Sequence, residues 1–349
     1  MEMVEKVQNQ PRIPAELIKL QEIVEKEEND RISVLPDCLL LEILPRLYSI
    51  EDAIRTGTLS KRWKHLWTLL PTLIIKQNPE KHPLSDFVSF IDKTLAQCRQ
   101  LKLKKFYLQT SEYDCRFEFQ VNKWIHYAIK CNVEELSITL WDMDTGDVHQ
   151  LDQHFLTSSC FTSLKLEFCT FTPTVAISWR NLRSLFINRM KLDEDLIENI
   201  LSGSPQLETL VLDSCYGFSL LNITSKSVKN LVLAGYNDTD NEYDRDFIIK
   251  INAPNILSLT IEDYFLYIWN ILLLDLSSLV EATIDFLIFG SMTTRKEAEE
   301  EMVKGFIPNL RHVKELKIGS RCAGVVDRLK AKGFVFPYVK LPYGWPDGN

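Results

Sequence analysis

The chain has 349 residues, enough for about two or three domains, and its 45% hydrophobic and 25% charged residues are ordinary for a folded globular protein. Forty basic against 48 acidic side chains leave a net charge of −8. This balance lacks the excess of basic residues that is typical of nucleic-acid-binding proteins.

The first residues of the chain do not have the pattern of a secretory signal. Charged residues begin at position 2, and no continuous apolar core follows. The longest apolar stretch, residues 265–276, is interrupted by Asn270 and Asp275 and is too short to cross a bilayer. We therefore expect a cytoplasmic and/or nuclear protein that has neither a membrane nor a nucleic acid among its partners.

Residues 1–29 form a charged amino-terminal extension with seven Glu against three Lys and one Arg. Apolar residues at helical spacing predict a short solvated helix here. We assign this segment no function.

Three helix signals follow within residues 30–75. An apolar stripe after Asp37 predicts the first helix. Ser49 and Asp52 fit a capping box at the start of a second, short helix, which Gly57 is placed to end. The third is predicted from Ser60 and carries two Trp on one face. Because a domain of ~45 residues cannot bury this much apolar surface alone, we expect a partner protein to cover part of it.

This segment resembles an F-box. The resemblance rests on Leu35-Pro36-Asp37, on Ile43-Leu44 with Leu47, and on Leu59-Ser60-Lys61-Arg62-Trp63 followed by Leu66-Trp67. It implies docking on a Skp-family adaptor, which links F-box proteins to a cullin and a RING subunit in an SCF-type ubiquitin ligase. The adaptor-binding residues that it implies are Leu35, Pro36, Ile43, Leu44, Leu47, Leu59, Trp63, Leu66 and Trp67.

Two positions depart from the F-box pattern. Pro45 falls inside the expected first helix, at a cost of ~3 kcal/mol unless the helix ends or kinks there. Gly57-Thr58 replaces the usual small and aliphatic pair before Leu59. Both departures are expected to weaken docking at most, without abolishing it.

Residues 76–340 repeat a hexad of the form L-x-x-L-x-L nine times, at a mean spacing of about 26 residues, which is typical of leucine-rich repeats. Each repeat supplies a short strand, and stacking of neighbours closes the core. Residues 121–136, 201–218 and 253–264 resemble plant F-box proteins with leucine-rich repeats, and residues 313–337 partly resemble the closing strands of their FBD module. The central residues of the hexads are Phe106, Leu136, Leu164, Leu185, Leu210, Leu231, Leu259, Ala282 and Leu316.

The expected fold class is α+β: a small three-helix F-box, followed by an irregular α/β leucine-rich-repeat solenoid with a parallel concave sheet. The predicted domains are the amino-terminal extension at 1–29, the F-box at 30–75, the leucine-rich-repeat domain at 76–340 and a carboxy-terminal tail at 341–349. Outward-facing strand residues between the hexad anchors are expected to line the concave face. They are Lys165, Phe186, Val211, Val232 and Thr260.

The chain shows no motif of a serine hydrolase, a zinc protease or a phosphate-binding loop. The eight cysteines have no clustered spacing and are interpreted as reduced, mostly buried thiols. His149 and His154 are spaced poorly for a shared metal, and the acidic stretches Asp142–Asp147 and Asn237–Asp246 lack the Gly and Glu of calcium loops. We therefore predict no catalytic residue, cofactor or metal.

The function predicted from these observations is that of a non-catalytic substrate-recognition subunit of an SCF-type ubiquitin ligase, with the repeats binding an unknown target protein. The main alternative is a repeat scaffold that acts without ligase assembly. A hormone receptor of the F-box type and an independent hydrolase are further alternatives.

Overall fold

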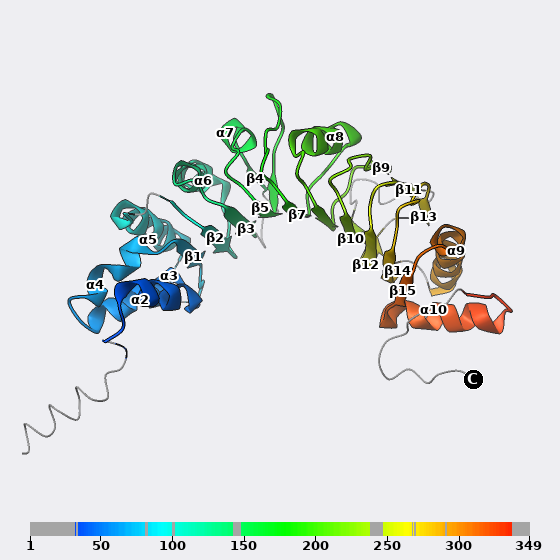
Figure 1. The fold of residues 1–349 in the computed structure, drawn as a ribbon, viewed down its shortest axis with the longest axis horizontal. Helices are drawn as coiled ribbons and strands as arrows, with labels where there is room; N and C mark the ends of the chain where they lie inside the picture. Colours follow the sequence, from blue (N-terminus) through cyan, green and yellow to red (C-terminus); the bar gives the residue numbers. More distant parts are fainter. Residues whose placement is uncertain are drawn as a thin grey trace, which may run out of the picture.

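The computed structural model describes residues 32, 34–80, 83–99, 102–141, 148–237, 247–266, 268, 270–289 and 292–336. The predicted extension at 1–29 and the tail at 341–349 lie outside these residues, as do residues 142–147 and 238–246 of the two acidic stretches. The described chain forms an arc, with strands along its inner side and helices along most of its outer side (Figure 1).

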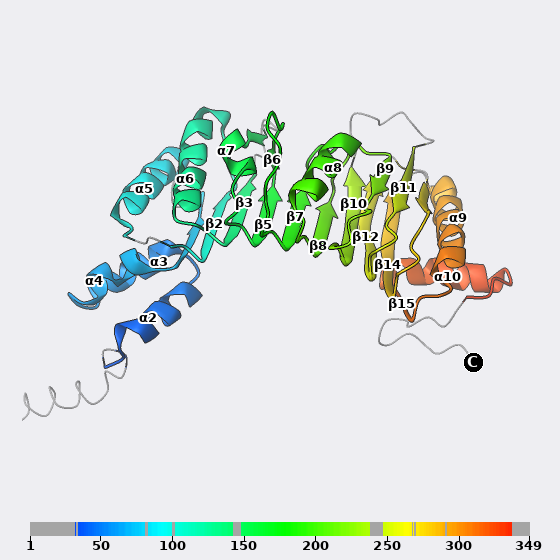
Figure 2. The same cartoon turned by 45° about the horizontal axis from the view of Figure 1, so that its top comes forward.

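The inner side is one ten-stranded sheet in which neighbouring strands are parallel. The strands follow one another in chain order, so each connection passes over the outer side of the arc (Figure 2). They are β1 (Thr72–Lys76), β2 (Lys105–Thr110), β3 (Glu135–Leu140), β5 (Ser163–Glu167), β7 (Ser184–Asn188), β8 (Thr209–Asp213), β10 (Asn230–Asn237), β12 (Ser258–Leu266), β14 (Glu281–Phe289) and β15 (Glu315–Ile318).

Each of the nine hexads coincides with one strand, from β2 to β15. Alternate side chains of a strand point to opposite faces, and the hexad residues take the face that points into the core. Phe106, Leu164 and Leu231, for example, are at most 1% exposed. The stacked repeats therefore share one continuous core, and the expectation of a leucine-rich-repeat solenoid with a parallel concave sheet is confirmed.

The outer layer is helical in the first repeats and partly extended in the later ones. Its helices are α5 (Leu84–Gln97), α6 (Glu118–Lys130), α7 (Gln153–Leu156), α8 (Glu194–Gly203) and α9 (Met292–Leu310), with a 3-10 turn η4 (Cys115–Phe117) before α6. Its strands are β4 (His149–Gln150) with β6 (Cys169–Thr170), and β9 (Leu220–Asn222), β11 (Ile248–Asn252) and β13 (Asn270–Leu273), which form a second parallel sheet.

The carboxy-terminal end of the arc carries helix α10 (Ser320–Ala331), which packs on β14 and α9. The segment that was expected to supply closing strands therefore contains one strand, β15, followed by a helix. Glu300 of α9 binds Arg328 and Lys332 at 3.0 and 2.5 Å, which ties the two helices together.

The amino-terminal end carries a small helical module. It consists of α2 (Asp37–Ile43), α3 (Ile50–Arg55) and α4 (Trp63–Leu66), each followed by a 3-10 turn: η1 (Leu44–Arg46), η2 (Thr56–Thr58) and η3 (Trp67–Leu69). The capping box is present, since Ser49 Oγ accepts a hydrogen bond from the Asp52 amide. Strand β1 follows directly and pairs with β2, so the predicted boundary at residue 75 lies inside the first strand of the sheet.

The local structure accommodates both departures from the F-box pattern, Pro45 and Gly57. The α-helix α2 ends at Ile43, and Pro45 lies in the first turn of η1, where its missing amide costs no hydrogen bond. At Gly57 a Cβ atom would lie 3.3 Å from the Cα atom of Lys64, so a small residue permits the close approach of α4. Within the described residues, no helix has the length and apolar character that a bilayer crossing requires.

Candidate interaction surfaces

The nine predicted adaptor-binding residues divide into two groups by exposure. Leu44, Trp63, Leu66 and Trp67 are 2–6% exposed and belong to the chain's own core. Leu35 and Leu47 are half-buried, Pro36 is exposed, and Ile43 and Leu59 are 44% and 66% exposed. The exposed and half-buried residues are therefore the ones available to a partner, whereas the buried four support that surface from below.

The two Trp side chains are buried within the chain itself. They belong to a core cluster that is continuous with Leu73 of β1 and Phe87 of α5 in the first repeat. Trp67 Nε1 also donates to the Lys64 carbonyl at 3.1 Å, which satisfies its one polar atom. The chain itself thus covers these two side chains, which do not need a partner to bury them.

Exposed apolar side chains are nevertheless concentrated on the module. Of the fifteen large ones among the described residues, seven lie between residues 32 and 69. Leu39 and Leu69, at 42% and 40% exposure, are not among the predicted adaptor-binding residues, although Leu39 lies one turn before Ile43 on the same helix face. Such a concentration is typical of a protein-binding surface.

The two ends of this surface are joined by Arg62. Its guanidinium binds Asp37 Oδ1 through Nε at 2.7 Å and through Nη2 at 2.5 Å, and Nη2 also donates to the Leu35 carbonyl. The segment before α4 is thereby fixed to the start of α2, which holds Leu35 and Leu59 in place without a partner.

The second candidate surface is the concave face of the sheet. Lys165, Phe186, Val211, Val232 and Thr260 are in register on five neighbouring strands, as expected. All five are half-buried, since one side of each is open to solvent. They form a row, called here the middle row, whose centre is apolar.

A parallel row lies one pleat further toward the carboxyl ends of the strands. It consists of Glu167, Asn188, Asp213, Ala234, Glu262 and Asp285. Burial raises the pKa of the Asp213 carboxyl, and the nearby charges of Asp263 and Glu167 act in the same direction. The concave face therefore combines an apolar centre with an acidic border, in which Glu167 pairs with Lys165 and Asp285 with Arg321.

The residue that follows this acidic row has a positive φ in five successive repeats. Phe168, Arg189, Ser214, Gly235 and Asp263 all have φ between 51° and 77°. This shared backbone aligns an aromatic and basic group at the rim of the arc. The Trp141 and Phe168 rings stack 5.5 Å apart, and the Arg189 guanidinium lies 5.3 Å from the centre of the Phe168 ring.

Two cysteines of the repeats, Cys169 and Cys215, have a structural role. They follow Phe168 and Ser214 and donate their thiols to the Glu167 and Ile187 carbonyls at 3.2 and 3.4 Å. Burial raises the pKa of Cys215 to about 12, so its thiol stays protonated and unreactive. All eight are free, four of them buried, two half-buried and two exposed.

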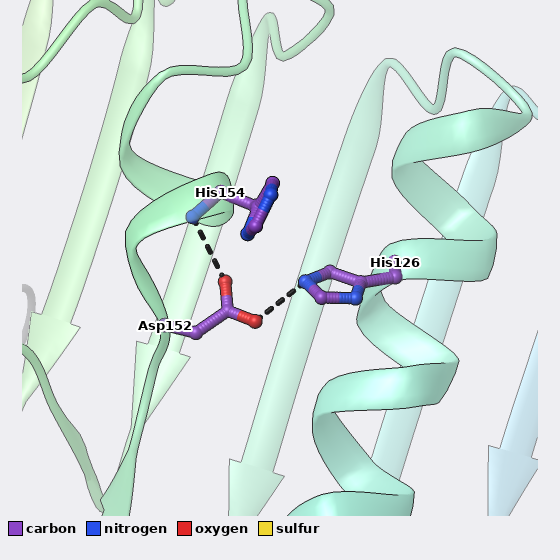
Figure 3. Close-up of side chains that lie close together, drawn as sticks. All are labelled: His126, Asp152 and His154. Atoms are coloured by element: carbon purple, nitrogen blue, oxygen red, sulfur yellow. Dashed lines mark hydrogen bonds and ion pairs between the residues drawn. The ribbon is translucent and has the colours of Figure 1, made fainter.

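One group of side chains was missed by the sequence analysis. His126 of α6 and the pair Asp152 and His154 of α7 lie together on the outer side of the arc (Figure 3). Their possible ligand atoms are all within 4.8 Å of one another. The sequence carries only the D-x-H spacing of Asp152 and His154, and the third member comes from another repeat.

Comparison with known proteins agrees with the fold. A family model described as At1g61320/AtMIF1, LRR domain, matches residues 94–281. F-box protein At5g03100 of Arabidopsis thaliana is 32% identical over 314 residues, which cover 88% of this chain and 94% of that protein. F-box/LRR-repeat protein 13 of the same plant is 28% identical over 86% of this chain and 67% of its own length, and putative F-box/LRR-repeat protein At5g02930 is 28% identical over 89% and 65%.

The structure defines a leucine-rich-repeat solenoid with a small helical module at its amino-terminal end. The chain belongs to the plant family of F-box proteins with leucine-rich repeats. It spans nearly all of one similar relative and about two thirds of several others.

Proposed function

We propose that this chain is the substrate-recognition subunit of an SCF-type ubiquitin ligase and that it acts in the cytoplasm, the nucleus or both. The observation that carries the proposal is the exposed apolar surface of the F-box module, on which Ile43 and Leu59 stand uncovered. A Skp-family adaptor would cover this surface and link the chain to a cullin and a RING subunit.

The chain itself would supply no chemistry. The repeats would hold a target protein, and tethering would raise the concentration of its lysines near the charged ubiquitin-conjugating enzyme. The concave face supports target binding, because its apolar middle row and acidic border suit a protein segment with apolar and basic side chains. The alternative, a scaffold without ligase assembly, makes the same use of the concave face but leaves the F-box surface free.

Immunoprecipitation from plant cells separates the two functions. The wild-type chain is expected to recover cullin and RING subunits, and the double variant Ile43→Glu, Leu59→Glu to recover neither, because two charges would be buried in the adaptor interface. Val175→Glu, which charges a side chain of similar exposure at 42% in the repeats, is the matched control and should behave as the wild type. A folded wild-type chain that recovers neither subunit would overturn the proposal and favour the scaffold.

A further inference from the structure

The outer side of the arc holds a cluster that adaptor docking and target binding on the concave face do not use. His126 projects from α6, while Asp152 and His154 come from the start of α7 in the next repeat (Figure 3). The two imidazole rings meet edge to face, with centroids 5.1 Å apart, and the Asp152 carboxylate lies beside them (Figure 3).

The two oxygens of Asp152 have different partners. Oδ1 accepts hydrogen bonds from the His154 and Phe155 amides at 3.0 and 3.2 Å and so caps α7. Oδ2 lies 2.5 Å from Nε2 of His126. The cap therefore fixes the carboxylate and leaves its second oxygen directed at the histidines.

An ion pair between His126 and Asp152 does not account for the whole cluster. Within the described part of the chain, His126 Nε2 is a buried atom with no hydrogen bond of normal geometry, despite its closeness to Oδ2. The pair also does not involve the second imidazole, whose ring packs edge to face on His126 and whose ligand atom lies within 4.8 Å of the other two. Two imidazole nitrogens and one carboxylate oxygen are instead a donor set that suits a divalent transition metal.

We propose that His126, Asp152 and His154 form a Zn²⁺ site that joins α6 to α7. Zinc bound to nitrogen and oxygen at about 2.0–2.2 Å keeps tetrahedral ligands ~3.3 Å apart. The His126 and Asp152 atoms must separate slightly, and the exposed His154 side chain turns inward to complete the set. Water fills the fourth position on the solvent side. Bound metal then fastens the outer layers of two neighbouring repeats to each other.

Isothermal titration of the full chain with Zn²⁺, in chelator-free buffer at about pH 7.5, tests the site. The wild type is expected to bind one Zn²⁺ per chain, and His126→Gln and His154→Gln should each weaken binding at least about tenfold. Asp152→Asn keeps a good helix cap but removes the charge, and it should weaken binding as well. His65→Gln, an exposed histidine of the F-box module, is the matched control.

Two further readouts make the result decisive. Circular dichroism without metal checks that the variants fold, which is expected because the substituted imidazoles are solvent-accessible. Replacement of Zn²⁺ by Co²⁺ distinguishes nitrogen and oxygen ligands from thiolates by the absorption spectrum. A wild-type chain that binds no Zn²⁺ at micromolar concentration, a thiolate spectrum, or unchanged binding in His126→Gln and His154→Gln would each overturn the proposal.

Discussion

His149 is a histidine that the fold keeps neutral. It is fully buried, and its two ring nitrogens contact the Tyr113 hydroxyl at 2.9 Å and Asn122 Oδ1 at 3.3 Å. Because the Asn122 oxygen is an acceptor, Nε2 donates to it and Nδ1 accepts from Tyr113. Burial lowers the pKa of this imidazole from 6.5 to about 4, and the weaker influence of Asp152 acts in the opposite direction.

This residue predicts a pH dependence of stability. Between pH 6.5 and 4 the unfolded chain binds a proton at His149 that the folded chain excludes, so stability is complete above 6.5 and falls as the pH decreases. The loss by pH 4 is about 3 kcal/mol. Urea denaturation at several pH values should show a shallower decrease for His149→Gln than for the wild type or His65→Gln. Equal slopes in all three proteins would contradict this assignment.

At the scale of the element, two helical glycines have opposite surroundings, one crowded and one open. Gly203 ends α8, and a Cβ atom there would lie 2.4 Å from the Ile177 carbonyl oxygen of the preceding loop. Gly305 lies in the exposed interior of α9, where a Cβ atom would meet nothing within 4 Å. The first glycine permits close packing between repeats, and the second only weakens its helix.

Alanine at the two positions should therefore shift stability in opposite directions. Gly203→Ala is expected to destabilise the chain by about 1–3 kcal/mol through backbone displacement. Gly305→Ala should stabilise it by about 0.5–1 kcal/mol, because alanine restricts the unfolded chain and favours helix. Apparent melting temperatures measured side by side test this pair of expectations. A shift in the same direction for both variants would show that the environment of one glycine is misassigned.

The repeat strands could be predicted because their signal is local. A hexad determines which side chains of a strand point into the core. All nine hexads coincide with strands. Strand β1 was missed although Leu70, Leu73 and Ile75 have the hexad spacing, because this segment was assigned to the F-box. The outer strands β9, β11 and β13 have only three to five residues, too few for a clear period.

The interaction surfaces were predictable only in part, since exposure depends on contacts between distant segments. The F-box pattern named Ile43 and Leu59 together with Trp63 and Leu44, but it could not show that the fold buries the latter two. The convergence of His126 on Asp152 likewise arises from the stacking of one repeat on the next, which no spacing in the sequence displays.

At the scale of the whole molecule, the three candidate interaction surfaces lie on different parts of the arc. The F-box module stands at one end, the concave face opens along the inner side, and the histidine cluster lies between outer helices (Figures 1 and 3). A target held in the concave face and an adaptor held at the end of the arc would not compete for the same residues. Substitutions on one surface should therefore leave the other functional.

The most direct test of the proposed function is the dissociation constant between the full chain and a purified Skp-family adaptor. The double variant Ile43→Glu, Leu59→Glu is preferable to substitutions at Trp63 or Leu44, because those two are buried and their truncation would cost about 2–5 kcal/mol of folding stability. The account predicts tight binding by the wild type and by Val175→Glu, and at least a hundredfold weaker binding by the double variant, which corresponds to about 2.7 kcal/mol or more. A correctly folded wild-type chain that does not bind the adaptor would contradict it.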